Sequence, residues 1–377
     1  MQLRARVFDS FEELAPYADR WKELVPLSPG NSIFLTWEWL SAWNTHVAQG
    51  VPLYIIAVFD ERGIPVAFLP LYQSSFHLLK CIRYTCLRPM GDCHCGAEYP
   101  DIIAAPARMT EVVTCIQDCF EQHQAKWDCL YFRYISGHTN AVSRLTRVIP
   151  VRRAFSRSRE AVFSSITLPD NIEELDRNMS RSLSLLVRRQ KRKLEQLGRL
   201  SINICQREQE ISLYLDSLFN LHKKRWESVG QQGSFVRRPL MRDFYAGFAA
   251  MALAKGWLKL FSLQIDGVTL AVQIGYLYNG VFSQMQEGFD PDGPGGLGNV
   301  LRHGVLNWCI NNKVKEYDYL GGNEEQKLKW GAKQRTGYHL FCGAKSWKNS
   351  VLAMADIWPT GRFIAEGPPA SYGCSHD

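Results

Sequence analysis

The chain has 377 residues, of which 46% are hydrophobic and 12% aromatic, and its formal net charge is +7. This composition excludes a disordered chain, and the length exceeds what one hydrophobic core usually supports, so we expect two domains. The sequence has no uninterrupted run of 18 apolar residues, and its first residues include no apolar signal segment. We therefore expect no transmembrane segment and a cytoplasmic location.

The cysteines are typical of a reducing compartment. There are eleven, an odd number, spread from Cys81 to Cys374, which is the pattern of reduced thiols rather than of a disulfide framework. The densest cluster contains Cys93, His94 and Cys95. Its spacing does not match paired zinc-binding motifs, so no metal site is predicted.

Residues 1–150 alternate between helical and strand patterns. Amphipathic spacing predicts helices over 11–24, 34–47 and 111–123, and β-rich runs predict strands over 52–60, 64–74, 99–106 and 127–135. Thr36 is positioned to cap the second helix, and Glu61-Arg62-Gly63 forms the turn of a hairpin. The predicted order is helix, helix, hairpin, strand, helix, strand.

The net charge is concentrated in residues 177–199, which contain eight basic residues and one acidic residue. The stretch also has an apolar helical stripe, and Gly198 is placed to end the helix. The stripe consists of Met179, Leu183, Leu186, Val187, Leu194 and Leu197. The basic face is either a solvated surface or a site for an anionic small ligand, a nucleotide-linked or polysaccharide acceptor, RNA or an acidic membrane surface.

The second half repeats the element order of the first half. Helices are predicted over 210–227 and 240–256, followed by a strand over 257–266 and a last strand over 337–347. Between them, two β-rich runs meet at Asn279-Gly280, which is a strong hairpin signal. Two similar α/β modules joined by a basic helix indicate a tandem domain.

A glycine-rich loop follows this hairpin. Gly293, Gly295, Gly296 and Gly298 precede a predicted helix whose apolar stripe includes Leu301, Val305, Trp308 and Cys309, and Asn299 is expected to be its cap. Glycines let backbone N–H groups approach an oxyanion, and a helix N-terminus favours negative charge. The loop matches neither the dinucleotide fingerprint nor a Walker loop. It is therefore either a phosphate site of another kind or a connection that needs positive φ angles.

Several motifs together resemble a known family. They are FLTWEWLSAW (34–43), RRQKRKLEQLG (188–198), LHKKRWESVGQQGSF (221–235), GFDPDGPGGLGNVL (288–301) and YDYLGGNEEQKLKWG (317–331). Their order and spacing resemble the GNAT family of N-acetyltransferases. The whole chain is similar to bacterial acetyltransferases of cellulose and exopolysaccharide synthesis, which are related to the tandem-GNAT Fem peptidyltransferases.

The resemblance implies an α/β (α+β) fold of tandem GNAT-like domains, each with a mixed, mostly antiparallel sheet flanked by helices. We expect an N-terminal domain over 1–165 on the acceptor side, a basic connecting helix over 166–200, a C-terminal domain over 201–360 that holds the acyl donor, and a flexible tail over 361–377. The resemblance also implies that acetyl-coenzyme A is the acyl donor. The residues expected to bind it are Gln284, Met285, Gln286, Gly295, Gly296, Gly298 and Asn299.

Direct attack on a thioester needs a base for the acceptor, an acid for the thiolate and donors for the oxyanion. The candidate bases are Asp318, Glu287, Asp290 and His222, with Asp318 slightly preferred over Glu287. Tyr319 or Tyr317 is the candidate acid. Each of these residues also has a structural interpretation, as a buried carboxylate, a packed histidine or a core tyrosine.

The expected acceptor is an amino or hydroxyl group of a sugar or sugar-linked precursor, and a polysaccharide synthase complex is an expected partner. Residues expected to bind it are Arg225, Trp226, Lys327 and Trp330. Two alternatives are a Fem-like transferase that uses aminoacyl-tRNA, and a non-catalytic module that docks onto other proteins.

Overall fold

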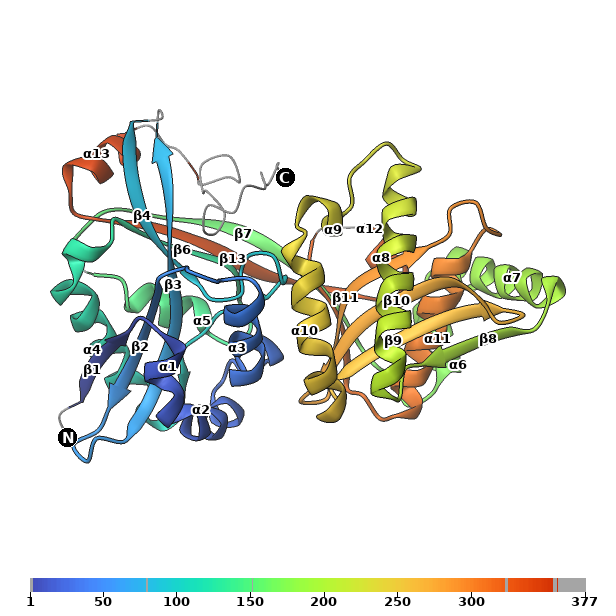
Figure 1. Cartoon of the computed structure of the whole chain (residues 1–377), viewed down its shortest axis with the longest axis horizontal. Coiled ribbons are helices and arrows are strands. Elements are labelled where there is room, and N and C mark those ends of the chain that lie inside the picture. Colours follow the sequence, from blue (N-terminus) through green and yellow to red (C-terminus); the bar gives the residue numbers. More distant parts are fainter. Residues whose placement is uncertain (1–2, 79–80, 151, 323–324, 355–357, 359–377) are drawn as a thin grey trace. The chain divides into compact units, whose positions relative to one another are not determined.

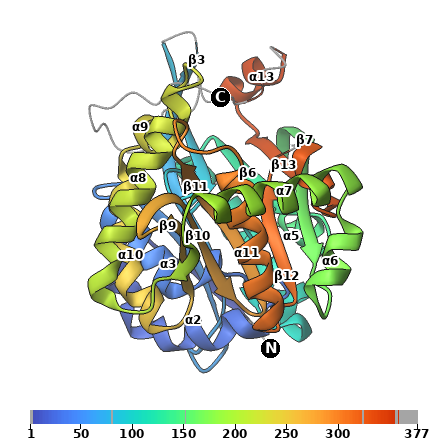
Figure 2. The same ribbon diagram turned by 90° about the vertical axis from the view of Figure 1, so that its right-hand side faces the viewer.

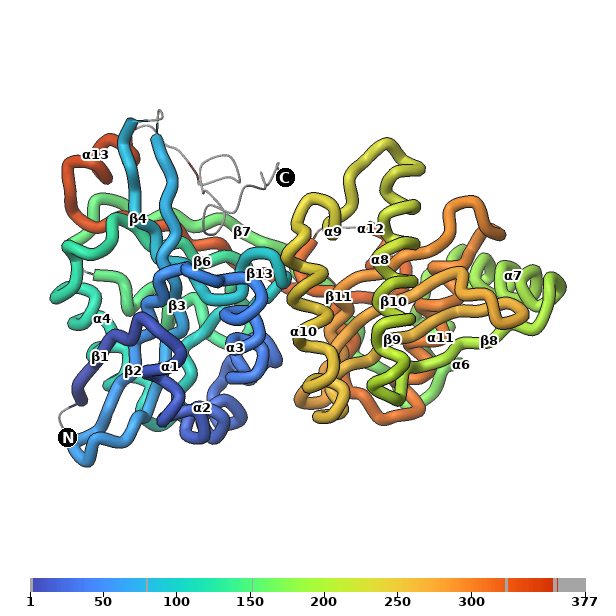
Figure 3. Tube along the Cα trace, viewed as in Figure 1, coloured from blue at the N-terminus to red at the C-terminus, as the bar shows by residue number. Residues whose placement is uncertain are grey.

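The computed structural model describes residues 3–78, 81–150, 152–322, 325–354 and 358. These residues form two compact units. The first unit comprises residues up to 161 and those from 336 onward, and the second comprises residues 162–335. The boundaries fall within two strands, β7 (Arg153–Thr167) and β13 (Lys333–Ala344), so each of these strands has residues in both units (Figures 1 and 3).

The first unit contains helices around a mainly antiparallel sheet. Its other elements are β1 (Arg4–Phe8), α1 (Phe11–Leu14), α2 (Ala18–Leu24), α3 (Trp37–His46), β2 (Leu53–Phe59), β3 (Pro65–Leu78), β4 (Ile82–Pro89), β5 (Ile103–Ala104), α4 (Met109–Gln122), β6 (Cys129–Ser136), α5 (Ala141–Arg147) and α13 (Trp347–Met354).

The strand order in the first unit is β1-β2-β3-β4-β6-β13, with β5 paired to β3. All neighbours in this order are antiparallel except β4 and β6, which are parallel at Cys86 and Leu87. One face of the sheet packs against α4 and α5 in a core that also includes the β13 residues Leu340 and Cys342. The first unit therefore needs residues from near the end of the chain.

The second unit is also an α/β arrangement. Its other elements are α6 (Ile172–Asn178), α7 (Arg181–Leu197), β8 (Leu200–Ile204), α8 (Ile211–Glu227), α9 (Ser234–Arg237), α10 (Leu240–Ala254), β9 (Leu258–Ile265), β10 (Val268–Tyr278), β11 (Val281–Phe289), α11 (Leu297–Asn311), β12 (Glu316–Gly321) and α12 (Glu325–Lys329).

The strand order in the second unit is β7-β12-β11-β10-β9-β8. The pairs are antiparallel except β11 with β12. Helices α8 and α10 pack on one side of this sheet, and α11, covered in turn by α6 and α7, packs on the other (Figure 2). The core on the α11 side joins Val300, Leu301 and Val305 of that helix to Phe261 and Phe282 of the strands.

The two units share one element order. In each, three antiparallel strands lead to a helix and then to a strand parallel to the third. These are β2, β3, β4, α4 and β6 in the first unit, and β9, β10, β11, α11 and β12 in the second. The α/β fold with two similar modules, expected from the sequence, is confirmed.

Local signals at three positions are confirmed. Asn279 and Gly280 have φ angles of 50° and 76°, as the tight hairpin turn requires, and Tyr278 pairs with Val281 across it. The Thr36 side chain accepts a hydrogen bond from the Trp39 N–H and caps α3. Helix α7 ends before Gly198, where a Cβ atom would lie 2.1 Å from an Asp266 carboxylate oxygen, so only glycine fits.

Three expectations about helices were wrong. Asn299 does not cap α11, because that helix begins at Leu297 after Gly296, and Leu297 is buried in the core. Leu186 and Leu197 of the α7 stripe are 42% and 59% exposed, because the buried side of the helix is narrow.

The compact units group some segments differently from the expected domains. Residues 166–200 lie in the second unit and residues 336–354 in the first. The expected tail over 361–377 lies outside the described residues.

Candidate functional site

Strands β11 and β12 separate partway along their length. They pair at three positions, of which Ser283 with Asp318 is the last. Beyond it, β11 continues to Phe289 paired with β10, and β12 continues to Gly321, which pairs with Phe163 of β7. We call the diverging segments, Gln284–Phe289 and Tyr319–Gly321, the fork. Along the fork the backbone edge of β11 that faces β12 is released from the ladder.

Two local features produce the fork. The register of β10 and β11 shifts so that Ile274 pairs with Gln286 and Gly275 with Gln284, which leaves Met285 as a bulge. On the other strand, Leu320 has a φ angle of 61°, and Asp318 accepts a hydrogen bond from its N–H at 2.8 Å. A leucine rarely adopts this conformation, so the Asp318 carboxylate stabilises the bend of β12.

A charged cluster lies in the fork. Glu287 of β11 accepts hydrogen bonds from Arg302 of α11 at 2.6 Å and from Arg225 of α8 at 3.1 Å. Burial raises the pKa of Glu287, but the two guanidinium groups outweigh it, and the pKa falls below its ordinary value. Glu287 is therefore a poor proton acceptor, and the cluster of two arginines and one glutamate has a net positive charge.

A chain of hydrogen bonds connects this cluster to the sheet. Gln273 donates to the Tyr317 hydroxyl at 2.8 Å, Tyr317 donates to Gln284 at 2.7 Å, and Gln284 donates to Glu287 at 3.3 Å. Beside it, the Tyr319 hydroxyl is buried and has no hydrogen-bond partner among the described residues. Burial raises the pKa of Tyr319, so the hydroxyl keeps its proton and offers an unused donor.

His222 lies behind the fork, on α8. Its Nε2 accepts a hydrogen bond from the Trp226 indole at 3.1 Å, which places the proton of the neutral ring on Nδ1. Burial, and then Arg225, lower the pKa of His222 to about 4. The helix approaches β11 so closely that a Cβ atom on Gly288 would lie 2.5 Å from the His222 backbone nitrogen. His222 is therefore a weak base held against the sheet.

The glycine-rich turn is covered by the basic helix. Gly296 has a φ angle of 101°, and a Cβ atom there would lie 2.4 Å from the Gln190 side chain of α7. The Asn299 amide donates to Gln190 at 3.1 Å. Apart from its two chain neighbours, no atom of the described residues comes within 4 Å of a Cβ built on Gly295. A pyrophosphate would thus find free space at Gly295, but it would have to displace Gln190 to reach Gly296.

Of the residues expected to bind the acceptor, some lie beside the fork and others are buried beneath the surface. Arg225 is partly exposed beside the fork, with its guanidinium carbon 4.6 Å from the centre of the Phe289 ring. Lys327 is buried, and its Nζ donates to the carbonyl oxygens of Tyr319 and Gly321 at 3.4 Å. Trp330 is buried in the core. The structure therefore brings Arg225 and Trp226 close to the fork and uses Lys327 and Trp330 to support it.

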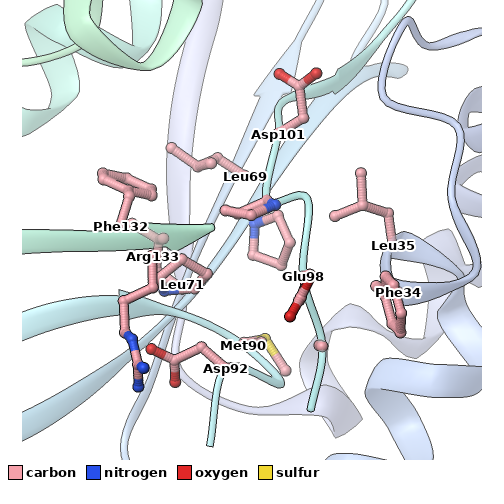
Figure 4. A pocket seen from close by; sticks show the side chains of 14 residues that line it. Phe34, Leu35, Leu69, Leu71, Met90, Asp92, Glu98, Asp101, Phe132 and Arg133 are labelled. Carbon is pink, nitrogen blue, oxygen red and sulfur yellow. The ribbon is translucent and has the colours of Figure 1, made fainter. Parts of the chain in front are cut away.

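The first unit has a corresponding position at the end of its own parallel pair, between β4 and β6. The pocket there is lined by Leu71, Met90, Asp92, Phe132 and Arg133, among others (Figure 4). Its volume is about 10 Å³, enough for a single water molecule. Asp92 is held by Arg88 and by the Tyr72 hydroxyl, each at 2.8 Å. Side chains therefore fill this position in the first unit.

A larger groove of about 420 Å³ lies in the second unit, between the edge strand β8 and α11. Its walls include Ile202, Phe261 and Trp308, with Lys191 of α7 at its margin. His303 also lines it, and the imidazole is bonded to Asp176 at 2.9 Å. The groove is mainly apolar with a few polar groups.

Sequence reasoning did not find Arg302, Gln190 or Gln273. Arg302 is a single basic residue within an amphipathic helix, and its partner Glu287 is 15 positions away. Gln190 and Asn299 are 109 positions apart. No local pattern connects such pairs, because the fold brings them together.

Among the residues that the structure describes, no cluster of three or more His, Cys, Asp or Glu side chains is arranged to hold a metal ion. None of the described helices is both long enough and apolar enough to cross a membrane.

The fork and the helix that follows it lie in a segment that matches a known family of domains. Residues 185–328, which include α8, β9 to β12 and α11, match the family model described as an acetyltransferase (GNAT) domain. A search of curated proteins found no match.

Solved structures show the same overall fold. FemX is 10% identical, covers 86% of this chain and 95% of its own, and superposes with a TM-score of 0.59. The C-terminal domain of a putative lysylphosphatidylglycerol synthetase from Agrobacterium fabrum is 12% identical, covers 95% and 99%, and gives a TM-score of 0.55. L-PGS from Bacillus licheniformis is 11% identical, covers 84% and 91%, and gives 0.51. At such low sequence identities, these comparisons show a similarity of fold alone.

Proposed function

We propose that the protein is an acyltransferase that uses acetyl-coenzyme A and transfers the acetyl group to an amino or hydroxyl group of a sugar or sugar-linked precursor. The observation that carries the proposal is the fork, where a released β11 edge lies next to a buried, unused hydroxyl at Tyr319 and a net positive cluster. When bound there, coenzyme A would supply a thioester carbonyl as the electrophile. A cytoplasmic location and association with a polysaccharide synthase are parts of this proposal.

The residues of the fork have distinct proposed roles. Gln284, Met285 and Gln286 would align the donor along the β11 edge. Arg302 and Arg225 would stabilise negative charge on the carbonyl oxygen, and the Tyr319 hydroxyl would donate a hydrogen bond to the leaving sulfur. Asp318 is the better remaining base, because the pKa of Glu287 is lowered by two arginines.

Calorimetric binding of acetyl-coenzyme A tests the donor. Gly298→Asp places a carboxylate in the first turn of α11, where it favours the helix but repels a phosphate. Gly298→Asn has nearly the same shape without the charge. We expect wild type and Gly298→Asn to bind, and Gly298→Asp to bind at least about tenfold more weakly, a difference of about 1.4 kcal/mol. The absence of binding to wild type would refute acetyl-coenzyme A as the donor.

The contact of Gln190 with the glycine-rich turn favours a second candidate function. Gln190 occupies the space next to Gly296 and is bonded to Asn299. An aminoacyl ester of tRNA has no pyrophosphate to place there, so it would leave Gln190 undisturbed. A transferase that uses aminoacyl-tRNA is consistent with this contact.

Gln190→Ala separates the two candidates. If the donor is coenzyme A, opening the turn should increase its affinity several-fold, whereas Gln196→Ala on the same helix should change nothing. If the donor is aminoacyl-tRNA, neither variant should bind coenzyme A. In that case, transfer of a radiolabelled aminoacyl group from charged tRNA should be measurable with wild type.

A further inference from the structure

Helix α7 presents most of its basic side chains to solvent. Arg181, Arg189, Arg192 and Lys193 are exposed and make no ion pair within the part of the chain that the structure describes. By contrast, Arg188 of the same helix pairs with Asp176 at 2.9 Å. Four unpaired cations on one 17-residue helix form a strong local positive field.

The same surface also exposes leucines. Leu185 is 57% exposed, Leu186 42% and Leu197 59%. Helical spacing places Leu185 in one row between Arg181 and Arg189, which are four positions before and after it. Leu186, Lys193 and Leu197 form the adjacent row. Leucine and basic side chains therefore alternate along one solvent-facing surface.

The opposite side of α7 fixes its orientation. Leu183, Val187 and Leu194 are buried in the core of the second unit, and Ser180 caps the helix by accepting from the Leu183 N–H. The helix is therefore held in place by its buried side, and the exposed leucines and cations are displayed on a rigid element. No rearrangement of the helix is needed for this surface to meet a partner.

We propose that α7 is an interfacial helix that docks the protein onto a membrane surface rich in anionic lipids. The arginines and the lysine would contact headgroup phosphates, while Leu185, Leu186 and Leu197 would enter the boundary between headgroups and acyl chains. This inference does not depend on the proposed enzymatic function, because binding is measured without turnover.

The leucines favour lipid over nucleic acid. Cations alone would suit RNA phosphates equally well, but exposed leucines add nothing to phosphate contacts, whereas they gain hydrophobic stabilisation in a bilayer interface. The exposed leucines of α7 therefore favour a lipid surface as the partner of this face.

Cosedimentation with vesicles tests the proposal. Wild type is mixed with vesicles of phosphatidylcholine alone or of phosphatidylcholine and phosphatidylglycerol in equal amounts, at low and high salt. We expect binding only to the anionic vesicles, weakened by salt. Arg189→Gln with Arg192→Gln should weaken it roughly fivefold for each charge removed. Leu185→Gln with Leu186→Gln should weaken it about tenfold or more.

A matched control is available on α8. Leu213 is 67% exposed and Lys223 is on the same helix, so Leu213→Gln with Lys223→Gln removes one exposed leucine and one cation elsewhere in the second unit and should leave binding unchanged. Circular dichroism confirms that each variant is folded. The proposal is overturned if wild type does not bind anionic vesicles, if the leucine variant binds as tightly as wild type, or if a tRNA mixture binds while vesicles do not.

Discussion

His222 is a buried histidine whose surroundings lower its pKa. It is 2% exposed, and its pKa is lowered to about 4, whereas an imidazole in an unfolded chain titrates near 6.5. Because the folded pKa is below the unfolded one, protonation favours the unfolded state. The stability that neutral His222 contributes is complete above about pH 6.5 and is lost as the pH falls toward 4.

We therefore expect the free energy of unfolding of wild type to fall between these pH values by up to about 3 kcal/mol more than that of His222→Gln. Urea unfolding at a series of pH values measures this difference. His77→Gln, at an exposed position, is the control and should retain the wild-type pH dependence. Identical pH profiles for wild type and His222→Gln would contradict the prediction.

At the scale of elements, the packing of α8 on β11 depends on one glycine. A Cβ atom on Gly288 would lie 2.5 Å from the His222 backbone nitrogen and 2.9 Å from the Leu221 carbonyl carbon. These are backbone atoms, which cannot turn aside as a side chain can. The helix can be this close to the strand only because residue 288 has no side chain.

Gly288→Ala should therefore destabilise the protein by about 1 to 3 kcal/mol, through displacement of α8 from the sheet. Gly295→Ala is the matched control, because its Cβ position has no atom within 4 Å from any described residue other than its chain neighbours, and it should stay within about 0.5 kcal/mol of wild type. Chemical denaturation measures both variants. Equal stability of the two would show that α8 is free to shift.

The elements that the sequence predicted best are those with strong local signals. The Asn279-Gly280 hairpin, the Thr36 cap and the end of α7 at Gly198 each depend on a few neighbouring residues. Strand β7 was missed because RAFSRSRE has charges at alternate and adjacent positions, and those residues are largely exposed.

The same distinction applies to the site. The glycine-rich turn and the β11 strand were visible in the sequence, but the ion pairs of Glu287 join three separate elements. Asp318 was weighed as a base or as a structural carboxylate, and its hydrogen bond to the Leu320 N–H, at a positive φ angle, is visible only in the structure. Roles that depend on tertiary contacts have no local signature.

At the scale of the whole molecule, the first unit depends on residues from β13. Leu340, Cys342 and Ala344 are part of its core, and β13 is the antiparallel partner of β6. A chain that ends at residue 335 loses all three side chains and the β6 pairing. The second unit, residues 162–335, keeps its own strands and helices.

We expect this truncation to abolish protection from hydrogen exchange in peptides covering β2 and β3, while peptides covering β9 and β10 remain protected. A chain that ends at Trp358 retains β13 and α13 and should behave as wild type does in both regions. Hydrogen exchange read by mass spectrometry resolves the two sets of peptides. Protection of β2 and β3 without β13 would show that the first unit does not need it.

The pairing of β6 with β13 also sets the order in which the chain can fold during synthesis. Tyr84 of the first unit donates to the Lys348 carbonyl, 264 positions later. All strands that lie wholly in the second unit are synthesised before β13 leaves the ribosome. The second unit is made later than most of the first unit, but it can complete its fold first. At ordinary rates of translation, one edge of β6 therefore stays unpaired for roughly 10 to 40 s before β13 has been made. An unpaired strand edge is a template for pairing with other chains, so we expect the incomplete chain to be prone to aggregation until β13 has been made.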